Sequence, residues 1–307
     1  MTNSKPPIWR DRRFWRIAGQ FITVFVTAVI VTMLLGNLKR NLQQLGIQFG
    51  FDFLKQQASF DIGETLIAYN PTDTYSCALW VGLINSLRIA VTGIFFATVV
   101  GVSAGIARLS DNWLVRNIAL VYVEIFRNTP LLLQLLFWYF AVFLGFPKAE
   151  NKISWGFIGL SQNGLELPWF TLSPEFAALL LGLIFYTGAF IAEIVRGGIQ
   201  SVAKGQWEAA RSLGLKPGLV MRLVIFPQAL RVIIPPLTSQ YLNLTKNSSL
   251  AIAIGYPDIY FVASTTFNQT GKAVEVILLL MLTYLTLSLT ISVVMNLFNR
   301  TVQIQER

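Results

Sequence analysis

Residues 201–227, SVAKGQWEAARSLGLKPGLVMRLVIFP, decide the fold, because they form a polar, basic stretch between long apolar segments. Their centre predicts a short helix over residues 206–213. Gly205 is its expected N-cap, and Gly214 is the left-handed residue expected to end it. Glu208 suits the positive end of the helix dipole. Because so short a helix is marginal alone in water, we expect docking to stabilise it, with a partner protein as one candidate.

The spacing in this stretch resembles the EAA loop of ATP-binding-cassette (ABC) importer permeases. The matching positions are Glu208-Ala209-Ala210, Gly214, Val224 and Phe226-Pro227, where the family pattern has Ile and Leu-Pro at the last two sites. The resemblance implies a coupling helix that docks into a cleft of a cytoplasmic ATPase. The residues implied to carry this coupling are Lys204, Gln206, Glu208, Ala209, Ala210, Arg211 and Gly214. The alternative is a plain cytoplasmic helical hairpin.

The composition is that of an integral membrane protein. The chain is 54% hydrophobic and 13% charged, whereas a soluble domain is about a quarter charged. In a membrane protein, a net charge of +9 indicates how the chain is oriented in the membrane rather than that it binds nucleic acid. We therefore expect no nucleic-acid partner. The single cysteine, Cys77, and the lack of histidine exclude an intrachain disulfide and imidazole metal ligands.

The sequence contains no GxxxxGK[ST] phosphate-binding loop. If ATP drives this protein, another chain must bind it. We therefore expect a transport subunit rather than an enzyme, with no cofactor and no metal site of its own.

The amino-terminal region predicts three parts. Residues 1–14 are basic and form an expected cytoplasmic tail, and residues 15–35 predict a retained transmembrane helix because they are long for a signal sequence. Residues 36–78 mix charged and aromatic side chains and predict a structured periplasmic insert. This insert either rests on the membrane or a delivery protein, or is a surface loop without a role.

Residues 79–300 predict the main transmembrane domain, whose first span covers residues 79–107. Four small residues recur there at every fourth position: Gly93, Ala97, Gly101 and Gly105. They share one helix face, and such a stripe lets two helices approach closely in lipid. We therefore interpret the stripe as a packing surface rather than a ligand site.

The next span, residues 117–146, carries charged residues ahead of Pro130, where we expect a kink or a join between two segments. A charge within a span is costly and marks a functional candidate. Arg127 is that candidate, and a Glu124–Arg127 pair near the inner interface is the alternative. The segment FRNTPLLLQLLFWYF resembles the FR-x-TPLL-x-Q segment of polar amino-acid uptake permeases.

The following span, residues 176–196, is expected to begin at an N-cap, Ser173, followed by Pro174. Its segment TGAFIAEIVRGGIQSV resembles the same permease subgroup. Glu193 either faces a substrate pathway or only pairs with Arg196 or Arg127.

The fifth span starts near Phe226, and Pro235-Pro236 should break its hydrogen-bond ladder. The polar residues 243–249 then predict non-helical backbone lining a wet cavity. A helix restarting at Ser248 or Ser249 would aim free N–H groups at a substrate carboxylate. The pathway candidates here are Asn243, Lys246, Asn247 and Ser248. The alternative is an extracellular loop, and KNSSLAIAIGYPDIY again resembles the permease subgroup.

The last span covers residues 274–298, and residues 301–307 form a second expected cytoplasmic tail. With the tail inside and six spans, most of the 24 Lys and Arg residues fall in segments on the same side as residues 201–227. This asymmetry favours a cytoplasmic position for that loop and for both termini.

The combined resemblance implies an all-α integral membrane protein with the transmembrane fold of type I ABC importers. It implies about six spans, a five-span core and one amino-terminal helix, and the long amino-terminal region resembles general L-amino-acid permeases. The implied function is amino-acid import across a bacterial inner membrane. The implied partners are an ATPase dimer, a second and related permease subunit, a periplasmic solute-binding protein, the amino acid and membrane lipid. An ion-coupled secondary amino-acid transporter and a channel or structural membrane subunit are the alternatives.

Overall fold

The computed structural model of the chain describes residues 12–44, 46, 49–156 and 158–302. The chain divides into two compact units, Met1–Phe51 and Asp52–Arg307. Most of the predicted tails, residues 1–14 and 301–307, lie outside the described residues.

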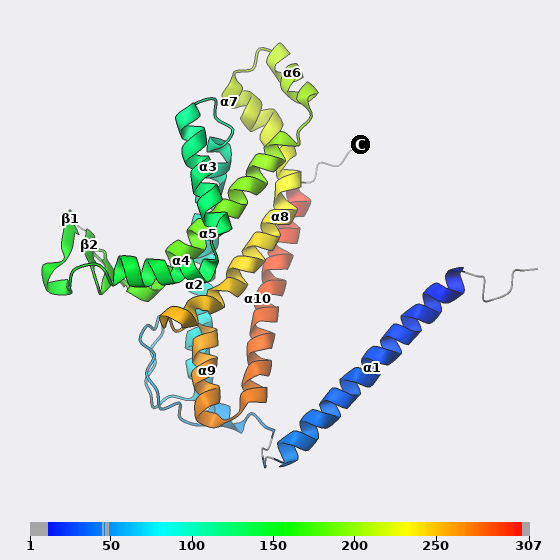
Figure 1. Cartoon of the computed structure of the whole chain (residues 1–307), viewed down its shortest axis with the longest axis vertical. Coiled ribbons are helices and arrows are strands. Elements are labelled where there is room, and N and C mark those ends of the chain that lie inside the picture. Colours follow the sequence, from blue (N-terminus) through cyan, green and yellow to red (C-terminus); the bar gives the residue numbers. More distant parts are fainter. Residues whose placement is uncertain (1–11, 45, 47–48, 157, 303–307) are drawn as a thin grey trace, which may run out of the picture. The chain divides into compact units, whose positions relative to one another are not determined.

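The first unit contains α1 (Arg12–Gln44), one continuous helix (Figure 1). Its 33 residues span about 50 Å, longer than the ~30 Å hydrocarbon core of a bilayer. The helix runs past the predicted end at residue 35 and through Gly36, with no proline to stop it. Gly46, which follows its end, has a left-handed φ of +66°. The first part of the predicted insert, residues 36–78, is therefore helical.

The second unit is mostly helical. Its α-helices are α2 (Tyr75–Ala107), α3 (Trp113–Asn128), α4 (Leu131–Leu136), α5 (Pro174–Gln200), α6 (Lys204–Ser212), α7 (Pro217–Val220), α8 (Phe226–Asn247), α9 (Ile259–Thr270) and α10 (Ala273–Val302). Tighter 3-10 turns cover Asp52–Lys55, Ala149–Asn151 and Ser248–Ile254, and π-helical turns cover Phe137–Phe143 and Met221–Ile225. Over the described residues, five helices are long and apolar enough to span a membrane, or six if α3 and α4 form one broken span.

A small sheet is the exception to the predicted all-α fold. The strands β1 (Ile153–Trp155), β2 (Ile158–Ser161), β3 (Gly164–Glu166) and β4 (Thr171–Leu172) pair antiparallel in sequence order. The sheet lies in the connection between the π-helical turn that follows α4 and the start of α5. α5 begins where the sequence predicts, because the Ser173 hydroxyl accepts a hydrogen bond from the Phe176 N–H at 3.1 Å.

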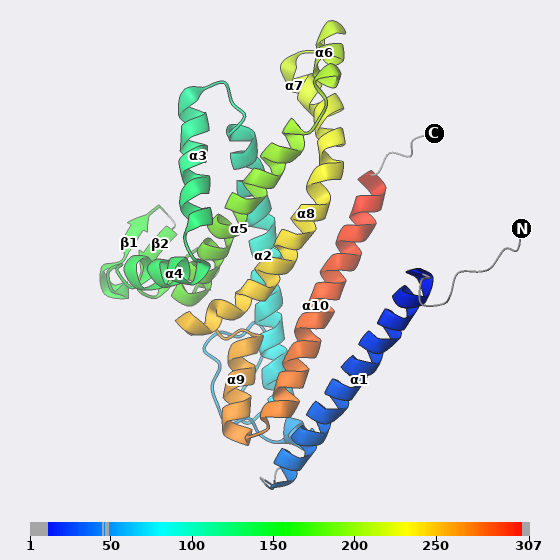
Figure 2. The ribbon, with the colours of Figure 1, turned by 45° about the vertical axis from the view of Figure 1, so that its right-hand side comes forward.

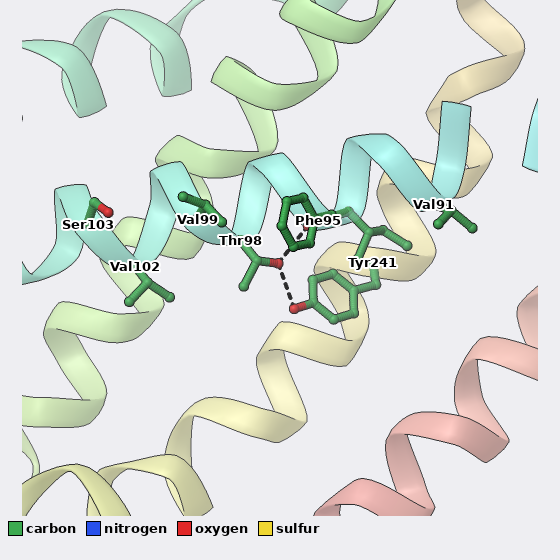
Figure 3. Close-up of a pocket in the computed structure, with 8 residues that line it drawn as sticks. Val91, Phe95, Thr98, Val99, Val102, Ser103 and Tyr241 are labelled. Carbon is green, nitrogen blue, oxygen red and sulfur yellow. Dashed lines mark hydrogen bonds between the residues drawn. The ribbon is translucent and has the colours of Figure 1, made fainter. Parts of the chain in front are cut away.

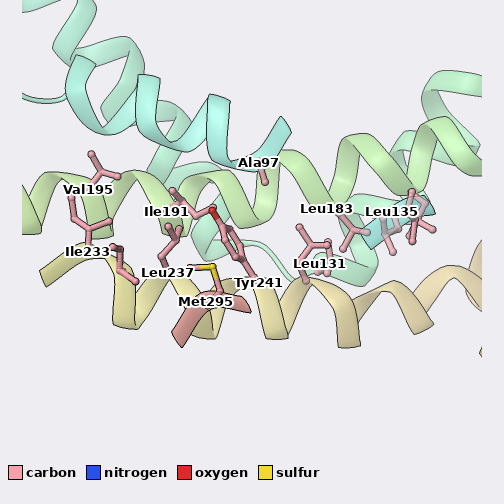
Figure 4. Close-up of a cluster of buried hydrophobic side chains, with 14 of the residues drawn as sticks. Ala97, Leu131, Leu135, Leu183, Ile191, Val195, Ile233, Leu237, Tyr241 and Met295 are labelled. Atoms are coloured by element: carbon pink, nitrogen blue, oxygen red, sulfur yellow. The ribbon is translucent and has the colours of Figure 1, made fainter. Parts of the chain in front are cut away.

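The core depends on the close approach of α2 to α5. A Cβ added at Gly101 would lie 2.5 Å from the Cβ of Ile191, and one at Gly105 would lie 2.6 Å from the Ala192 carbonyl oxygen. The predicted packing role of the small-residue stripe is therefore confirmed. Figure 4 shows the apolar cluster that continues from this contact to α8, with Leu135 of α4 and Met295 of α10 at its margins.

The chain turns by 107° between α3 and α4, at the predicted join, Pro130. Proline has no N–H, so the Phe126 carbonyl four residues earlier loses its helical donor. The buried Gln134 amide replaces that donor: its Nε2 donates to the Phe126 carbonyl at 3.0 Å and to the Thr129 carbonyl and hydroxyl at 3.1 and 2.7 Å. Gln134 thus holds both sides of the bend.

The end of the insert is fastened to the helices by a polar clasp made of Glu64, Asn85, Arg88 and Ser173. The Glu64 carboxylate accepts hydrogen bonds from the Arg88 guanidinium and the Ser173 hydroxyl. The buried Asn85 amide donates to the Glu64 and Pro257 carbonyls at 2.8 and 3.0 Å. The clasp therefore joins the insert, α2, the start of α5 and the segment before α9.

We predict that the Gly101→Ala variant unfolds at a lower temperature than the wild-type protein in detergent. Alanine favours a helix over glycine by about 1 kcal/mol, but its Cβ would force α2 and α5 apart. Gly197→Ala in α5 is the matched control, because no atom lies within 4 Å of its added Cβ. A Gly101→Ala variant as stable as Gly197→Ala would contradict the close-packing role.

We also predict that Gln134→Leu destabilises the protein, because the Phe126 and Thr129 carbonyls lose their side-chain donor at a cost of about 1–3 kcal/mol. Gln162→Leu is the control, since Gln162 donates to the Leu144 carbonyl from an exposed position. Thermal unfolding checks both variants, and equal melting temperatures would exclude a special role for Gln134 in the bend.

Candidate functional site

The predicted coupling helix is present as α6, at the end of the bundle where α5 and α8 meet their shared loop (Figure 2). It begins at Lys204, two residues before the predicted start, and its N-cap is Ala203 rather than Gly205. The predicted stop is present, since Gly214 has a φ of +73°. The Gly214 N–H also donates to the Arg211 carbonyl at 2.9 Å.

α6 is held to its own chain by one face. Ala210 is 3% exposed and packs in the core, with Trp207 and Leu215 half-buried beside it. The side-chain Oε1 of Gln206 accepts a hydrogen bond from the Gln228 side-chain amide at 3.2 Å. Ala210, predicted to serve the ATPase, therefore anchors the helix within this subunit.

The opposite face of α6 is exposed. It carries the predicted residues Lys204, Glu208, Ala209 and Arg211. Leu213 follows them with 80% of its surface exposed, although apolar side chains of this size are usually buried. Sequence reasoning missed Leu213, and the available signal was an apolar residue directly before a helix-ending glycine.

A second group of predicted residues meets around Glu193. Arg196 Nε lies 3.1 and 3.2 Å from the two Glu193 oxygens, and the Arg108 guanidinium also binds this carboxylate. Arg127 Nη1 is 4.0 Å from Glu193 Oε2. Both predicted pairings of Glu193 therefore form. Sequence reasoning missed Arg108, although it is the first charged residue after the apolar run of α2.

The predicted Glu124–Arg127 pair is wrong. The Glu124 carboxylate instead accepts a hydrogen bond from the Asn128 amide at 3.0 Å. Arg127 turns toward α5, where its guanidinium carbon lies 5.3 Å from the centre of the Phe190 ring.

The Glu193 cluster lies on an uncovered stripe of α5. Tyr186, Phe190, Glu193, Gly197 and Gln200 recur at three- and four-residue spacing, and none is buried. Charged side chains in a span avoid hydrocarbon and face a wet pathway or another protein surface. This stripe therefore has the chemistry of a pathway wall or a subunit contact.

The prediction for residues 243–249 is wrong, because α8 continues through Pro235-Pro236 to Asn247 and passes directly into the Ser248–Ile254 turn. The Ser248 N–H donates to the Leu244 carbonyl, so no free helix N-terminus exists there. The hydroxyl side chains in this stretch, Thr245, Ser248 and Ser249, donate hydrogen bonds back to helix carbonyls. The Ser248 hydroxyl, for example, donates to the Thr245 carbonyl at 2.8 Å.

The four candidates in this segment differ in exposure. Asn243 and Lys246 are exposed, Asn247 is half-buried and Ser248 is fully buried. Within the described part of the chain, no hydrogen bond or ion pair connects these four residues to the Glu193 cluster. Ser248 is therefore packed inside this chain, whereas the other three side chains are accessible in it.

An open hollow of about 680 Å³ lies along α2 (Figure 3), but its chemistry does not suit an amino acid. Its walls are mainly apolar side chains such as Val91, Phe95 and Val99. The polar groups of Thr98 and Tyr241 bond to each other at 2.8 Å. With no charged lining residue, the hollow matches a surface for lipid or another helix.

We predict that Glu193→Gln destabilises the protein by about 1.5–3 kcal/mol, because the Arg108 side chain, 12% exposed, loses its carboxylate partner. Glu166→Gln is the control, since its partner Lys152 is 45% exposed and such a pair should contribute only about 0–1 kcal/mol. Thermal unfolding would contradict this assignment if the two variants lost equal stability.

Comparison with known proteins identifies the family of the chain. Residues 93–304 match the family model described as "Binding-protein-dependent transport system inner membrane component". The chain is 42% identical to the putative amino-acid ABC transporter permease protein YhdX of Escherichia coli K12, over 94% of each chain. It is 38% identical to the general L-amino acid transport system permease protein AapQ of Rhizobium johnstonii, over 97% of this chain and 94% of AapQ.

Solved structures show the same likeness. A chain from the crystal structure of an amino acid ABC transporter with histidines superposes with a TM-score of 0.60 and 29% identity. The match covers 74% of the present chain and 95% of that one. An inward-facing MetNI methionine ABC transporter shares the fold at a TM-score of 0.58 and 20% identity, over 75% of this chain and 98% of that one.

Proposed function

Because this chain belongs to the family of binding-protein-dependent inner-membrane transport components, we propose that it carries amino acids through the membrane. It is a multi-pass permease subunit of an ABC importer, with the type I transmembrane fold, and is not itself an enzyme. The predicted resemblance to amino-acid permeases is confirmed. The proposed substrate class rests on the names of these relatives and on the charged stripe of α5.

The proposed assembly contains an ATPase dimer, a second and related permease subunit and a periplasmic solute-binding protein. The observation that carries the ATPase contact is α6, which is fixed by Ala210 on one side and fully uncovered on the other. In this proposal Lys204, Gln206, Glu208, Ala209 and Arg211 contact the ATPase, Leu213 fills an apolar site in it, and Gly214 ends the helix at the correct place. ATP-driven closure of the ATPases then moves α5 and α8 through α6.

The proposed orientation puts α6 and the amino terminus in the cytoplasm. The same side holds most of the basic residues, in agreement with the positive-inside rule. The clasp at Glu64 and Ser173 then faces the periplasm, where the solute-binding protein releases the amino acid to the permease.

The proposed pathway follows the uncovered stripe of α5. Glu193 lies on it and Arg127 of α3 lies beside it. The exposed side chains of Asn243 and Lys246, with the half-buried Asn247, are further candidates on α8. Alternating access would open this stripe first to the periplasm and then to the cytoplasm.

Co-purification tests the assembly against an ion-coupled transporter or a channel. The tagged chain should bring down an ATPase, and amino-acid uptake should require both ATP and the solute-binding protein. Uptake driven by an ion gradient without an ATPase would refute the importer assignment.

We predict that Leu213→Asp reduces amino-acid uptake and solute-stimulated ATP hydrolysis about tenfold or more, because losing one buried leucine contact costs about 1.5–3 kcal/mol. Leu289→Ala on α10 is the control, since Leu289 is also exposed, at 56%, but lies far along the chain from α6. Solute binding by the delivery protein should not change.

Normal uptake and normal stimulated ATP hydrolysis in Leu213→Asp would contradict the coupling role of this residue. Loss of stimulation in Leu289→Ala as well would mean that the effect is not specific to α6.

A further inference from the structure

We propose that the Arg127 guanidinium is the anchor for a substrate carboxylate. Arg127 would thereby favour zwitterionic and anionic amino acids over cationic ones within the membrane pathway. The inference rests on the proposed function, and it assigns the substrate chemistry of one residue in that pathway.

The hydrogen-bonding capacity of Arg127 is free. The Glu193 oxygens are bonded to Arg196 and Arg108. Arg127 Nη1 lies 4.0 Å from Glu193 Oε2, which is too long for a hydrogen bond. The Arg127 guanidinium donates to no other described residue, so its five N–H groups remain for a ligand.

The charge balance of the cluster calls for an anion. Three arginines surround a single carboxylate, and among the described residues no other acidic group lies within ion-pair distance of them. Glu124 on α3 is exposed and bonded to Asn128. Arg108 caps the end of α2, whereas Arg127 lies inside α3 and Arg196 inside α5. A positive charge within a span is unfavourable. A ligand carboxylate would reduce the excess positive charge, whereas a cationic side chain would increase it.

The position of Arg127 is suited to such a ligand. Its side chain is 35% exposed, against 12% for Arg108 and 28% for Arg196, so a solute can reach it most easily. The Phe190 ring lies 5.3 Å from its guanidinium carbon and holds it beside the α5 stripe. The planar guanidinium can bind both oxygens of a carboxylate at once, which the ammonium group of lysine cannot match.

The backbone at Ser248 offers no competing site for a carboxylate. The predicted carboxylate site there required a free helix N-terminus, and the Ser248 N–H is already bonded to the Leu244 carbonyl. Arg127 is then the cationic group of the predicted pathway set that lies beside the α5 stripe, since Lys246 has no bond to the cluster.

An oxyanion at Arg127 has two sources, a substrate carboxylate or the phosphate of an anionic lipid. Equilibrium binding of radiolabelled glutamate, glutamine and arginine to the complete importer separates them. The importer is held in nanodiscs without the delivery protein, whose own selectivity is thereby removed. One set of nanodiscs contains phosphatidylcholine alone, and the other also contains phosphatidylglycerol.

We expect Arg127→Gln to weaken glutamate and glutamine binding at least tenfold in both lipids and to leave arginine binding unchanged or stronger. Arg127→Lys keeps the charge but loses the planar guanidinium. Its affinity for glutamate and glutamine should therefore fall between that of the wild type and that of Arg127→Gln. Arg116→Gln is the control, because Arg116 lies on the same helix and its side chain donates only to the Ser110 carbonyl among the described residues.

Equal glutamate affinity in the wild type and Arg127→Gln would overturn the inference, and so would an absence of glutamate binding to the wild type. Competition by phosphatidylglycerol that disappears in Arg127→Gln would assign Arg127 to lipid phosphate and also overturn it. ATP-dependent uptake by the wild type with its delivery protein is measured in parallel. If the wild type shows no ATP-dependent uptake, the proposed function is refuted. If the wild type shows uptake but Arg127→Gln binds glutamate as well as the wild type, only the carboxylate anchor is refuted.

Discussion

The contact between α2 and α5 is the constraint on which the rest of the structure depends. Helices in lipid gain little from the hydrophobic effect and associate through close packing. Gly101 and Gly105 remove the side chains that would keep the two backbones apart. Once α5 is fixed, its ends are fixed too. One end starts at Ser173 beside Glu64, and the other leads directly into α6.

The break between α3 and α4 is important because α3 ends beside α5, whereas an unbroken helix would continue past α5. Pro130 removes one helical hydrogen bond, and Gln134 closes the gap without restoring a straight helix. Arg127, three residues before the proline, therefore lies next to Phe190 and Glu193. This one segment of sequence therefore has two roles. Pro130 and Gln134 shape the bend, and Arg127 presents a cation to α5.

Local signals were predictable from the sequence, and long-range partners were not. The small-residue stripe, the cap at Ser173 and the helix stop at Gly214 depend on spacing within one segment, and the structure contains all three. Arg108 reaches Glu193 across 85 residues, and no local pattern specifies such a contact. The polar residues near Ser248 led to a wrong prediction of a helix break. Side-chain hydroxyls can donate hydrogen bonds to backbone carbonyls of their own helix, so polarity alone does not predict a break.

The clasp between Glu64 and Ser173 joins residues 109 positions apart in the chain. A ribosome makes Glu64 long before it makes the start of α5, so the clasp cannot close while the earlier helices are being inserted. Until then Glu64 lacks the Ser173 hydroxyl, and Arg88 lacks the Phe176 ring that lies 3.9 Å from its guanidinium carbon. Biogenesis of the permease therefore has a built-in order, in which the outer surface matures only after the middle of the chain has entered the bilayer.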